Sequence, residues 1–316
     1  MRLALGLDIG GTKIAGGLVS AEGDCLVERR CPTPADDPAA IVTAVVQLAR
    51  DLLAHAPVAP LAVGLAAPGS VDSARGVCRE AANLPWRDLP LAPLVAEALG
   101  RPAFLENDTN AAALAEYTLG AGRGCRHFLY VALGTGIGAG IIADGRLYRG
   151  AHGEAGEIGH TIVAVDGPPC RCGARGCLET QATGRAMVER ARMALAAGQR
   201  STLSAEDLTV EELLRAAAAG DPVAQTARDQ TLAYLAAGLV SLFRLFDPER
   251  LAIGGGLAQA GDWLLAPLRA AMARQHAPRY DYSQRVVPAA LGHRAGVIGA
   301  ALVALDHLTE SAPTTV

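Results

Sequence analysis

The sequence predicts an α/β protein with two domains and an internally duplicated fold. A chain of 316 residues exceeds what one hydrophobic core usually fills. A hydrophobic fraction of 51% and 36 glycines fit buried sheets that are joined by many tight turns. The order strand, glycine turn, strand, turn, strand begins at residue 3 and begins again at residue 127, and such a repeat indicates duplication.

Composition argues against several classes of partner. The formal net charge of −4 gives no electrostatic basis for binding nucleic acid or an anionic membrane surface. Asp8 interrupts the apolar start, and no signal cleavage site follows it. The longest apolar helical stretch, 232–243, is too short to span a bilayer. Apart from one cluster, the seven cysteines are scattered, as in a reducing compartment. We therefore expect a soluble, cytoplasmic protein.

The first half of the chain alternates short apolar runs with segments of helical spacing. Three of these runs predict a meander whose first turn is rich in glycine. Asp108 or Thr109 is expected to cap the helix that begins near residue 110, and the region 72–93 is expected to be irregular. The elements expected are strands at 3–9, 14–19, 25–30, 61–69 and 102–108, and helices at 38–55, 94–99 and 110–117.

The second half begins with the repeated pattern. Thr209 and Glu212 have the spacing of a capping box. Asp221 followed by Pro222 is a favourable cap and first turn for a long helix. The elements expected are strands at 127–133, 141–144, 146–150, 251–258 and 284–288, helices at 183–198, from 209, at 222–246, 264–274 and 295–308, and a disordered tail at 310–316.

Three glycine turns, each directly after an apolar strand, are candidate phosphate sites. Glycine lets the backbone approach a phosphate, and successive N–H groups can form an anion-binding nest. None is a P-loop, because no G-x-x-x-x-G-K-[ST] occurs. The run GTGIGA matches a dinucleotide fingerprint, but strand-like IIADGRLY follows where that fingerprint needs a helix, so we reject NAD binding. For any one turn, the alternative is a plain tight turn. The candidate residues are Gly10, Gly11, Thr12, Lys13, Gly134, Thr135, Gly136, Gly138, Gly254, Gly255 and Gly256.

Two aspartates stand at the ends of predicted strands. Asp8 precedes the first glycine turn, where a carboxylate can hold Mg²⁺ between protein and phosphates. Asp108 follows Asn107 at a strand-to-helix junction, where it is either a helix cap or a general base for phosphoryl transfer. Lys13 is the only lysine among 28 basic residues, which reflects either chance or a need for a compact ammonium in this turn.

A cysteine cluster predicts a structural zinc site. Cys170, Cys172 and Cys177 form C-x-C-x4-C, and His160 lies ten residues before the first of them. Three thiolates and one imidazole complete a tetrahedral zinc shell with no position open for water. The alternatives are disulfides and idle thiols. Disulfides are disfavoured because three cysteines cannot all pair, and idle thiols because the number and spacing of the ligands fit zinc. Glycines within the loop let the backbone fold around an ion. A zinc that fixes His160 also fixes the nearby carboxylates Glu154 and Glu157, which suggests a ligand close by.

Together these motifs resemble the ROK family of bacterial sugar kinases and sugar-responsive repressors. The resemblance rests on D-x-G-G-T-K at 8–13, ENDTNAAALAEY at 106–117, LGTGIGAG at 133–140, the GEIGH and C-x-C-G-x-x-G-C-x-E run at 156–179, and IGGG at 253–256. It implies a duplicated ribonuclease-H-like fold, the actin-like ATPase type found in hexokinases, with two α/β domains around a cleft.

The resemblance also implies the domain ranges. Residues 1–120 with about 295–316 are expected to form the smaller domain. Residues 121–294 are expected to form the larger one, with the zinc site and an oligomerisation surface. A homodimer or homotetramer is implied in the same way.

By the same resemblance, Asp108 is the base that activates a sugar hydroxyl. The glycine turns bind ATP with Mg²⁺, and Zn²⁺ is structural. His160 would both ligate zinc and face the sugar, and Lys13 falls where relatives vary. The residues implied to bind the sugar are Asn107, Asp108, Glu154, Glu157, His160 and Glu179.

These expectations describe an ATP-dependent kinase of a hexose 6-hydroxyl. Glucose is the leading substrate, and N-acetylglucosamine, N-acetylmannosamine and fructose stay open. The alternatives are a sugar-sensing repressor and a catalytically inactive sugar-binding module. The first is disfavoured because no room for a winged helix-turn-helix precedes Gly10, and the second because both aspartates and all three turns are intact.

Overall fold

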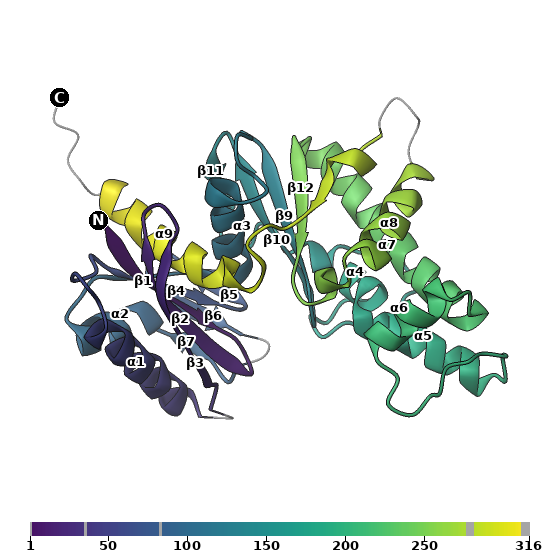
Figure 1. The fold of residues 1–316 in the computed structure, drawn as a ribbon, viewed down its shortest axis with the longest axis horizontal. Coiled ribbons are helices and arrows are strands. Elements are labelled where there is room, and N and C mark those ends of the chain that lie inside the picture. Colours follow the sequence, from purple (N-terminus) through teal and green to yellow (C-terminus); the bar gives the residue numbers. More distant parts are fainter. Residues whose placement is uncertain (1, 35–36, 82–83, 276–280, 311–316) are drawn as a thin grey trace. The chain divides into compact units, whose positions relative to one another are not determined.

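The computed structural model describes residues 2–34, 37–81, 84–275 and 281–310 (Figure 1). The chain forms two compact units. The first contains Met1–Gly124, Gly140–Ala155 and Ala290–Val316, and the second contains Cys125–Ala139 and Gly156–Ala289. Residues 140–155 therefore belong with the N-terminal part of the chain, although the sequence placed them in the larger domain. The expected disorder of residues 311–316 lies outside the described residues.

The first unit is built on a five-stranded sheet in the order β3-β2-β1-β4-β8. The first three strands pair antiparallel, and β4 and β8 are parallel to β1. All five were expected from the apolar runs, with bounds that differ by a few residues at most. The strands are β1 (Leu3–Ile9), β2 (Lys13–Ser20), β3 (Cys25–Pro32), β4 (Val63–Ala67) and β8 (Ala103–Asn107).

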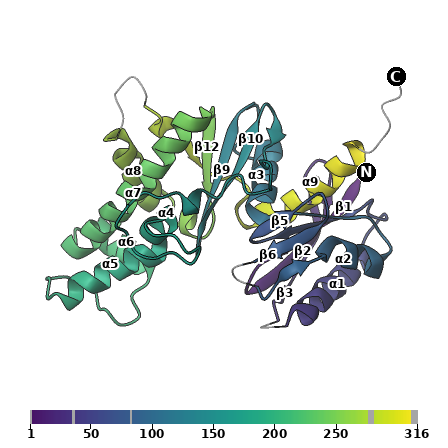
Figure 2. The same cartoon turned by 180° about the vertical axis from the view of Figure 1, so that it is seen from behind.

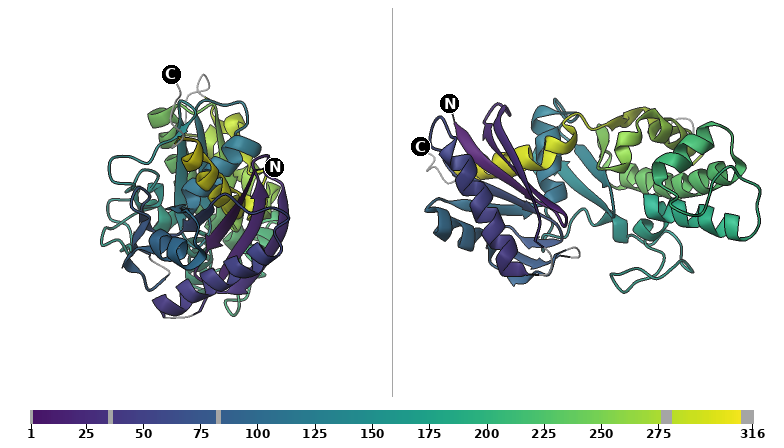
Figure 3. Two further views of the ribbon diagram at one scale, coloured as in Figure 1. Left: turned by 90° about the vertical axis from the view of Figure 1, so that its left-hand side faces the viewer. Right: turned by 60° about the horizontal axis from the view of Figure 1, so that its bottom comes forward.

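Helices cover both faces of this sheet, because side chains alternate between the faces along each strand. Leu5, Leu7 and Ile9 of β1 pack with α1 (Pro38–Ala54) and α2 (Leu91–Leu99), whereas Ala4 packs with the other face. That other face is covered by α9 (Ala295–Glu310), which also packs on α3 (Asp108–Leu119). Figure 3 shows the purple strands of β1 to β3 between α1 and the yellow α9.

Glycines set how closely α9 approaches the sheet. A Cβ at Gly6 or Gly64 would overlap the backbone carbonyl of Val297 or Ala300 in α9. No other residue fits at these two strand positions without moving the helix. The first turn of α9 is thereby held against the end of β1, where a Cβ at Gly296 would lie 2.5 Å from a carboxylate oxygen of Asp8.

The region expected to be irregular contains a second, three-stranded sheet. Its order is β5-β6-β7, and both pairings are antiparallel. The strands β5 (Ser70–Asp72), β6 (Val77–Glu80) and β7 (Arg87–Leu89) have three or four residues each. Runs this short show no clear alternation of apolar and polar residues, so the expectation was wrong here.

A second five-stranded sheet repeats the topology of the first, which confirms the predicted duplication. The order β11-β10-β9-β12-β13 matches β3-β2-β1-β4-β8 strand for strand. The β10–β11 pair is antiparallel, and β9, β12 and β13 are parallel. The chain passes into the first unit within β10. The strands are β9 (Phe128–Leu133), β10 (Ile137–Ala143), β11 (Arg146–Leu147), β12 (Arg250–Gly254) and β13 (Val286–Pro288).

The helices of the second unit, α4 to α8 in Figure 2, largely begin where the capping residues in the sequence predict. Thr209 and Glu212 form both bonds of the predicted capping box, and Asp221 caps the predicted long helix. A five-residue helix at 178–182 was not expected, because so short a segment carries no periodicity. The helices are α4 (Leu178–Ala182), α5 (Gly184–Ala196), α6 (Val210–Ala218), α7 (Pro222–Phe246) and α8 (Asp262–Ala273).

Within the first unit, Glu116 of α3 links the segment just after its own helix to residues 290–291, where the chain returns to this unit for the last time. Its buried carboxylate accepts hydrogen bonds from the N–H groups of Ala121, Ala290 and Leu291, at 2.9, 3.0 and 2.7 Å. Three N–H donors satisfy the charge that burial would otherwise penalise.

Among the described helices, none has the length and apolar character needed to cross a membrane.

Candidate active site

Asn107, not Asp108 or Thr109, caps helix α3, which corrects the sequence expectation. Asn107 has extended backbone angles, and its Oδ1 accepts from the N–H groups of Thr109 (2.9 Å) and Asn110 (3.1 Å). Its Nδ2 donates to the carbonyl of Gly69 at 3.1 Å. Asparagine and aspartate cap helices about equally well, so the sequence could not choose between neighbours. Because Asn107 caps the helix, Asp108 lies in the first helical turn, and its carboxylate is not the capping group.

The carboxylates of Asp108 and Asp8 are both buried in the first unit, and the charge of Asp108 acts on Asp8. Desolvation raises the pKa of Asp108, and hydrogen bonds from the N–H and Oγ1 of Thr109 partly oppose that rise. Desolvation raises the pKa of Asp8 to about 6, the charge of Asp108 adds to the rise, and the charge of Lys13 counters it. Neighbouring carboxylates of this kind are typical of functional sites. They also suit a divalent cation, which carboxylate oxygens bind.

The first glycine turn joins β1 to β2 beside Asp8. The N–H of Gly10 donates to the carbonyl of Lys13 at 3.0 Å, which closes the turn. Thr33, just after β3, braces it from outside: its Oγ1 donates to the carbonyl of Gly10 (2.6 Å) and its N–H donates to that of Thr12 (3.1 Å). Gly11 and Lys13 are exposed. The backbone N–H groups here are therefore placed at the end of a buried strand, as an anion nest requires.

The second and third glycine turns lie side by side in the second unit. They follow β9 and β12, which pair parallel with Gly254 opposite Ala132. Gly255 has φ +85°, and a Cβ there would overlap the backbone of Leu133. Gly134 and Gly256 have open space around a hypothetical Cβ. After the second turn the chain continues as strand β10, which agrees with the rejection of a dinucleotide fingerprint.

Glu179 links the cysteine segment to the second glycine turn. Its Oε2 accepts from the N–H of Ile137 at 3.3 Å, and a Cβ at Gly136 would overlap the same oxygen. Its Oε1 lies 3.8 Å from Nη2 of Arg171, between the first two cysteines of the cluster. Glycine at 136 is therefore needed for this carboxylate to reach the turn.

The structure brings His160, Cys170, Cys172 and Cys177 together. Their ligand atoms all lie within 4.8 Å of one another. The Sγ of Cys170 is 3.6 Å from Nδ1 of His160, and the Sγ atoms of Cys172 and Cys177 are also 3.6 Å apart. Ligands about 2.3 Å from a tetrahedral zinc lie about 3.8 Å from each other, so these residues fit the metal. All seven cysteines are free thiols, so the disulfide alternative finds no support.

The loop that carries the cysteines depends on glycine, as expected from the sequence. Gly173 and Gly176 have φ of +91° and +70°, a backbone region that favours glycine. A Cβ at Gly176 would also overlap the carbonyl of Ala164. Isolated antiparallel bridges pair Ile162 with Cys177 and Pro169 with Arg175 across the loop.

His160 presents its two ring nitrogens to different neighbours. Nδ1 faces the Sγ of Cys170, and Nε2 lies 3.8 Å from Oε2 of the exposed Glu157. Glu157 and His160 flank a short 3-10 turn, Ile158–His160. In the first unit, the exposed Glu154 lies in the loop that follows β11. Asn107, Asp108 and Glu154 thus belong to the first unit, and Glu157, His160 and Glu179 belong to the second.

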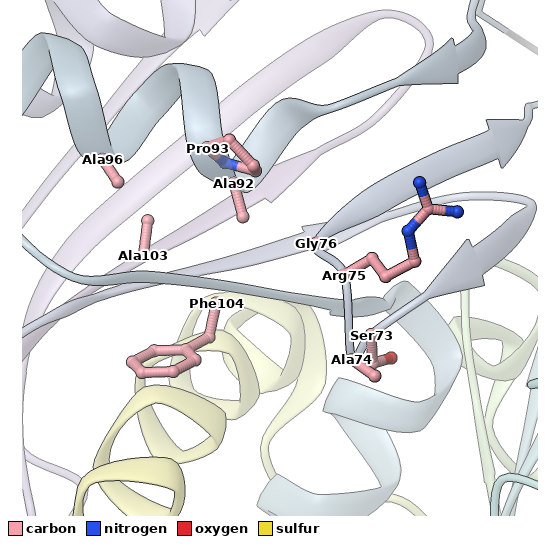
Figure 4. A pocket seen from close by; sticks show the side chains of 9 residues that line it. All are labelled: Ser73, Ala74, Arg75, Gly76, Ala92, Pro93, Ala96, Ala103 and Phe104. Carbon is pink, nitrogen blue, oxygen red and sulfur yellow. The ribbon is translucent and has the colours of Figure 1, made fainter.

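Sequence reasoning missed several residues around these groups. Thr33 hydrogen-bonds to the first glycine turn, and Glu116 accepts from the N–H of Ala290. Glu106, two residues before Asp108, forms an ion pair with Arg149. Their partners lie far away in sequence, so residue spacing contained no signal for them. A cavity of about 200 Å³ lies elsewhere in the first unit and is lined by none of the predicted residues (Figure 4). Its walls come from residues 73–76, helix α2, Ala103 and Phe104.

Comparison with known proteins identifies the family. Residues 4–307 match the sequence profile of the ROK family. The chain belongs to the ROK family. It is 39% identical to a glucokinase of Streptomyces coelicolor, over 97% of this chain and 98% of that protein. A ROK glucokinase from Streptomyces griseus, solved in complex with glucose and AMPPNP, is 37% identical, with a TM-score of 0.83, and the match covers 96% of this chain and 99% of that one.

Regulators of the ROK family have a similar fold. A transcriptional regulator described as a homolog of the E. coli MLC protein is 30% identical, with a TM-score of 0.86. The match covers 96% of this chain and 77% of the regulator. ROK kinases and regulators thus share the two-domain, actin-like ATPase fold that the duplicated sheets display.

Proposed function

We propose that the chain is an ATP-dependent glucokinase, which transfers the γ-phosphoryl group of ATP to the 6-hydroxyl of glucose. One observation carries the proposal: Asp108 does not cap its helix, and its charge acts on Asp8, which directly precedes the first glycine turn, in a chain similar over its whole length to ROK glucokinases. The substrate follows from the relatives, among which the Streptomyces griseus enzyme was solved with glucose and AMPPNP.

In the proposed reaction, Asp108 accepts the proton of the sugar hydroxyl. A general base contributes about 10²- to 10⁴-fold to a rate. The bonds from Thr109 fix one oxygen of Asp108, so the other is the oxygen that takes the proton. Asn107, Glu154, Glu157, His160 and Glu179 bind sugar hydroxyls, for which carboxylates and amides provide suitable acceptors and donors.

The three glycine turns bind ATP through backbone N–H groups. Asp8 holds Mg²⁺, which neutralises charge on the phosphates when it is bound. The His160 and cysteine cluster holds a structural Zn²⁺. We further propose that the protein works in the cytoplasm, where its free cysteines stay reduced, as a homodimer or homotetramer that associates through its larger domain. N-acetylglucosamine, N-acetylmannosamine and fructose are the alternative substrates.

A sugar-responsive regulator without kinase activity is the second candidate, because the regulator described above has the same fold at 30% identity. A coupled ADP-release assay distinguishes the two. With Mg·ATP, glucose should give the highest kcat/KM in a panel that includes the three alternative sugars. Asp108→Asn should lower kcat by at least about 100-fold, whereas Asp51→Asn, an exposed change in α1, should not. Sugar binding without turnover of any hexose would favour the regulator.

A further inference from the structure

Glu106 is a buried carboxylate that the proposed reaction does not use. It lies in β8, next to Asn107 and one residue before the last strand position of the first sheet, and its side chain is 2% exposed. Its Oε1 accepts hydrogen bonds from the N–H of Asn107 and from Nδ2 of Asn110, both at 3.0 Å. A buried carboxylate is costly unless it is paired. These two bonds attach Glu106 to both sides of Asp108.

The other oxygen of Glu106 reaches a distant part of the sequence. Its Oε2 accepts from Nε of Arg149 at 2.6 Å. Arg149 begins the loop that contains Glu154, and its backbone carbonyl accepts from the N–H of Ala155 at 3.1 Å. One residue therefore closes the loop 149–155 through its backbone and joins it to Glu106 through its side chain.

The same loop rests on the three-stranded sheet. Nη1 of Arg79 in β6 donates to the carbonyl of His152 at 3.5 Å. A Cβ at Gly153, which has φ +79°, would lie 2.7 Å from the carbonyl of Val71 in β5. Strands β5 and β6 thus contact the loop, and the side chain of Arg149 links the loop to Glu106, two residues before Asp108. All of these residues belong to the first unit.

We infer that Glu106 and Arg149 are positioning residues, which hold the Glu154 loop in register with Asp108. The inference rests on the proposed function, in which Asp108 takes the proton and Glu154 binds the same sugar. Geometry of this kind matters because a shift of about 1 Å at a reacting group can cost about 100-fold in rate. A purely structural ion pair is the competing explanation, since removing one partner of a buried pair destabilises a protein in either case.

Three substitutions separate these explanations. Glu106→Gln is nearly isosteric, keeps the oxygen that accepts from Asn107 and Asn110, and replaces the oxygen that accepts from Arg149 with an amide nitrogen, which cannot accept. Arg149→Met keeps the length of the side chain without the charge, and Arg149→Lys restores the charge. If Arg149→Met does not fold, the kinetics of Glu106→Gln alone test the inference.

Steady-state kinetics with glucose and Mg·ATP, together with the melting temperature, provide the measurement. Glu106→Gln and Arg149→Met should each raise the KM for glucose and lower kcat, giving a loss of about 100-fold in kcat/KM for glucose. The KM for Mg·ATP should stay within about twofold, because its expected ligands lie elsewhere. Arg149→Lys should recover part of the loss. The double variant should be no worse than Arg149→Met, as expected for coupled residues.

A surface ion pair supplies the matched control. Arg215→Met breaks the 2.8 Å contact with Glu211 on α6 and should leave both KM values and kcat unchanged. The inference is overturned if Arg149→Met and Glu106→Gln keep their glucose kinetics, or if both KM values change alike with a lowered melting temperature. Wild-type turnover of glucose, measured in parallel, reports on the proposed function: its absence would overturn both claims, whereas active wild type with unaffected variants overturns only this one.

Discussion

At the residue scale, Thr33 determines which way the peptide groups of the first glycine turn point. The carbonyls of Gly10 and Thr12 are bonded to Thr33, and the described chain has no cis peptide bond. In a trans peptide the N–H and C=O point in opposite directions. The N–H groups of Gly11 and Lys13 therefore point away from Thr33, in the direction from which we propose that a phosphate binds.

Replacing Thr33 should impair nucleotide binding selectively. Thr33→Val keeps the shape of the side chain but removes the hydrogen bond to Gly10, a loss of about 1 kcal/mol. We expect the KM for Mg·ATP to rise about fivefold and the KM for glucose to stay unchanged in steady-state kinetics. Thr33→Ser, which keeps the hydroxyl, should behave as wild type. Equal increases in both KM values would contradict this role.

Single residues also show what the sequence could and could not predict about the site. The cluster of His160 and three cysteines was predictable because all four lie within 18 positions, and the structure brings them together as a candidate metal site. Asp108 was recognisable from its place after a strand. Glu106 and Arg149 were not, because they are 43 positions apart and only the fold places them in contact.

At the element scale, Asp221 fixes the start of the long helix α7. Its carboxylate accepts from the N–H of Ala224 at the cap, and from Ser201 and Thr202 of the preceding loop. Burial disfavours the charged form, but these hydrogen bonds outweigh it and lower the pKa of Asp221 to about 2. One side chain thereby caps a helix and holds a loop.

This cap should make stability depend on pH in a defined direction. The folded pKa of about 2 lies below the ordinary aspartate value of 3.8, so the ionised group stabilises the folded state above about pH 4 and loses this effect as the pH falls toward 2. The difference in free energy of unfolding between wild type and Asp221→Asn should shrink by about 1 kcal/mol from about pH 6 to about pH 3.

Urea unfolding across that pH range measures the difference. Asp229→Asn, an exposed change on the same helix, should show no such trend. A constant difference between wild type and Asp221→Asn would mean that the cap is not ionised in the way described.

Elements were predictable where their signals were local. The cap at Asp221 and the capping box at Thr209 set the helix starts correctly, because capping depends on residues within one turn. The strands β5 to β7 and helix α4 were missed, since they have only three to five residues each. Their stability comes from tertiary contacts, for which the local sequence has no signature.

At the scale of the whole molecule, the two units, with sheets of the same strand order, hold separate sets of candidate site residues. The first unit holds Asp8, Asp108 and the first glycine turn, and the second holds the paired glycine turns and the cysteine cluster. The duplication was visible in the sequence because a glycine turn follows the first strand of each copy. The sequence did not show that residues 140–155 belong to the first unit, because the chain passes from one unit to the other inside strand β10.

Zinc removal should weaken sugar binding more than nucleotide binding. Nδ1 of His160 faces the thiols while Nε2 faces Glu157, so losing the metal should release the side chain that is proposed to meet the sugar. By calorimetry, the Kd for glucose should rise by at least about tenfold in metal-free protein and recover on addition of zinc. The Kd for a non-hydrolysable ATP analogue should change by less than about twofold. Equal losses for both ligands, or protein that contains no zinc by elemental analysis, would contradict this coupling.

The central claim is that this chain phosphorylates glucose at its 6-hydroxyl. Phosphorus NMR of the wild-type protein with glucose, ATP and Mg²⁺ tests it most directly, because it identifies the product as well as its rate of formation. The account predicts one new sugar phosphate signal, that of glucose 6-phosphate, which grows in step with ADP and is nearly abolished by Asp108→Asn. ATP that stays intact, or that yields inorganic phosphate with no sugar phosphate, would contradict it.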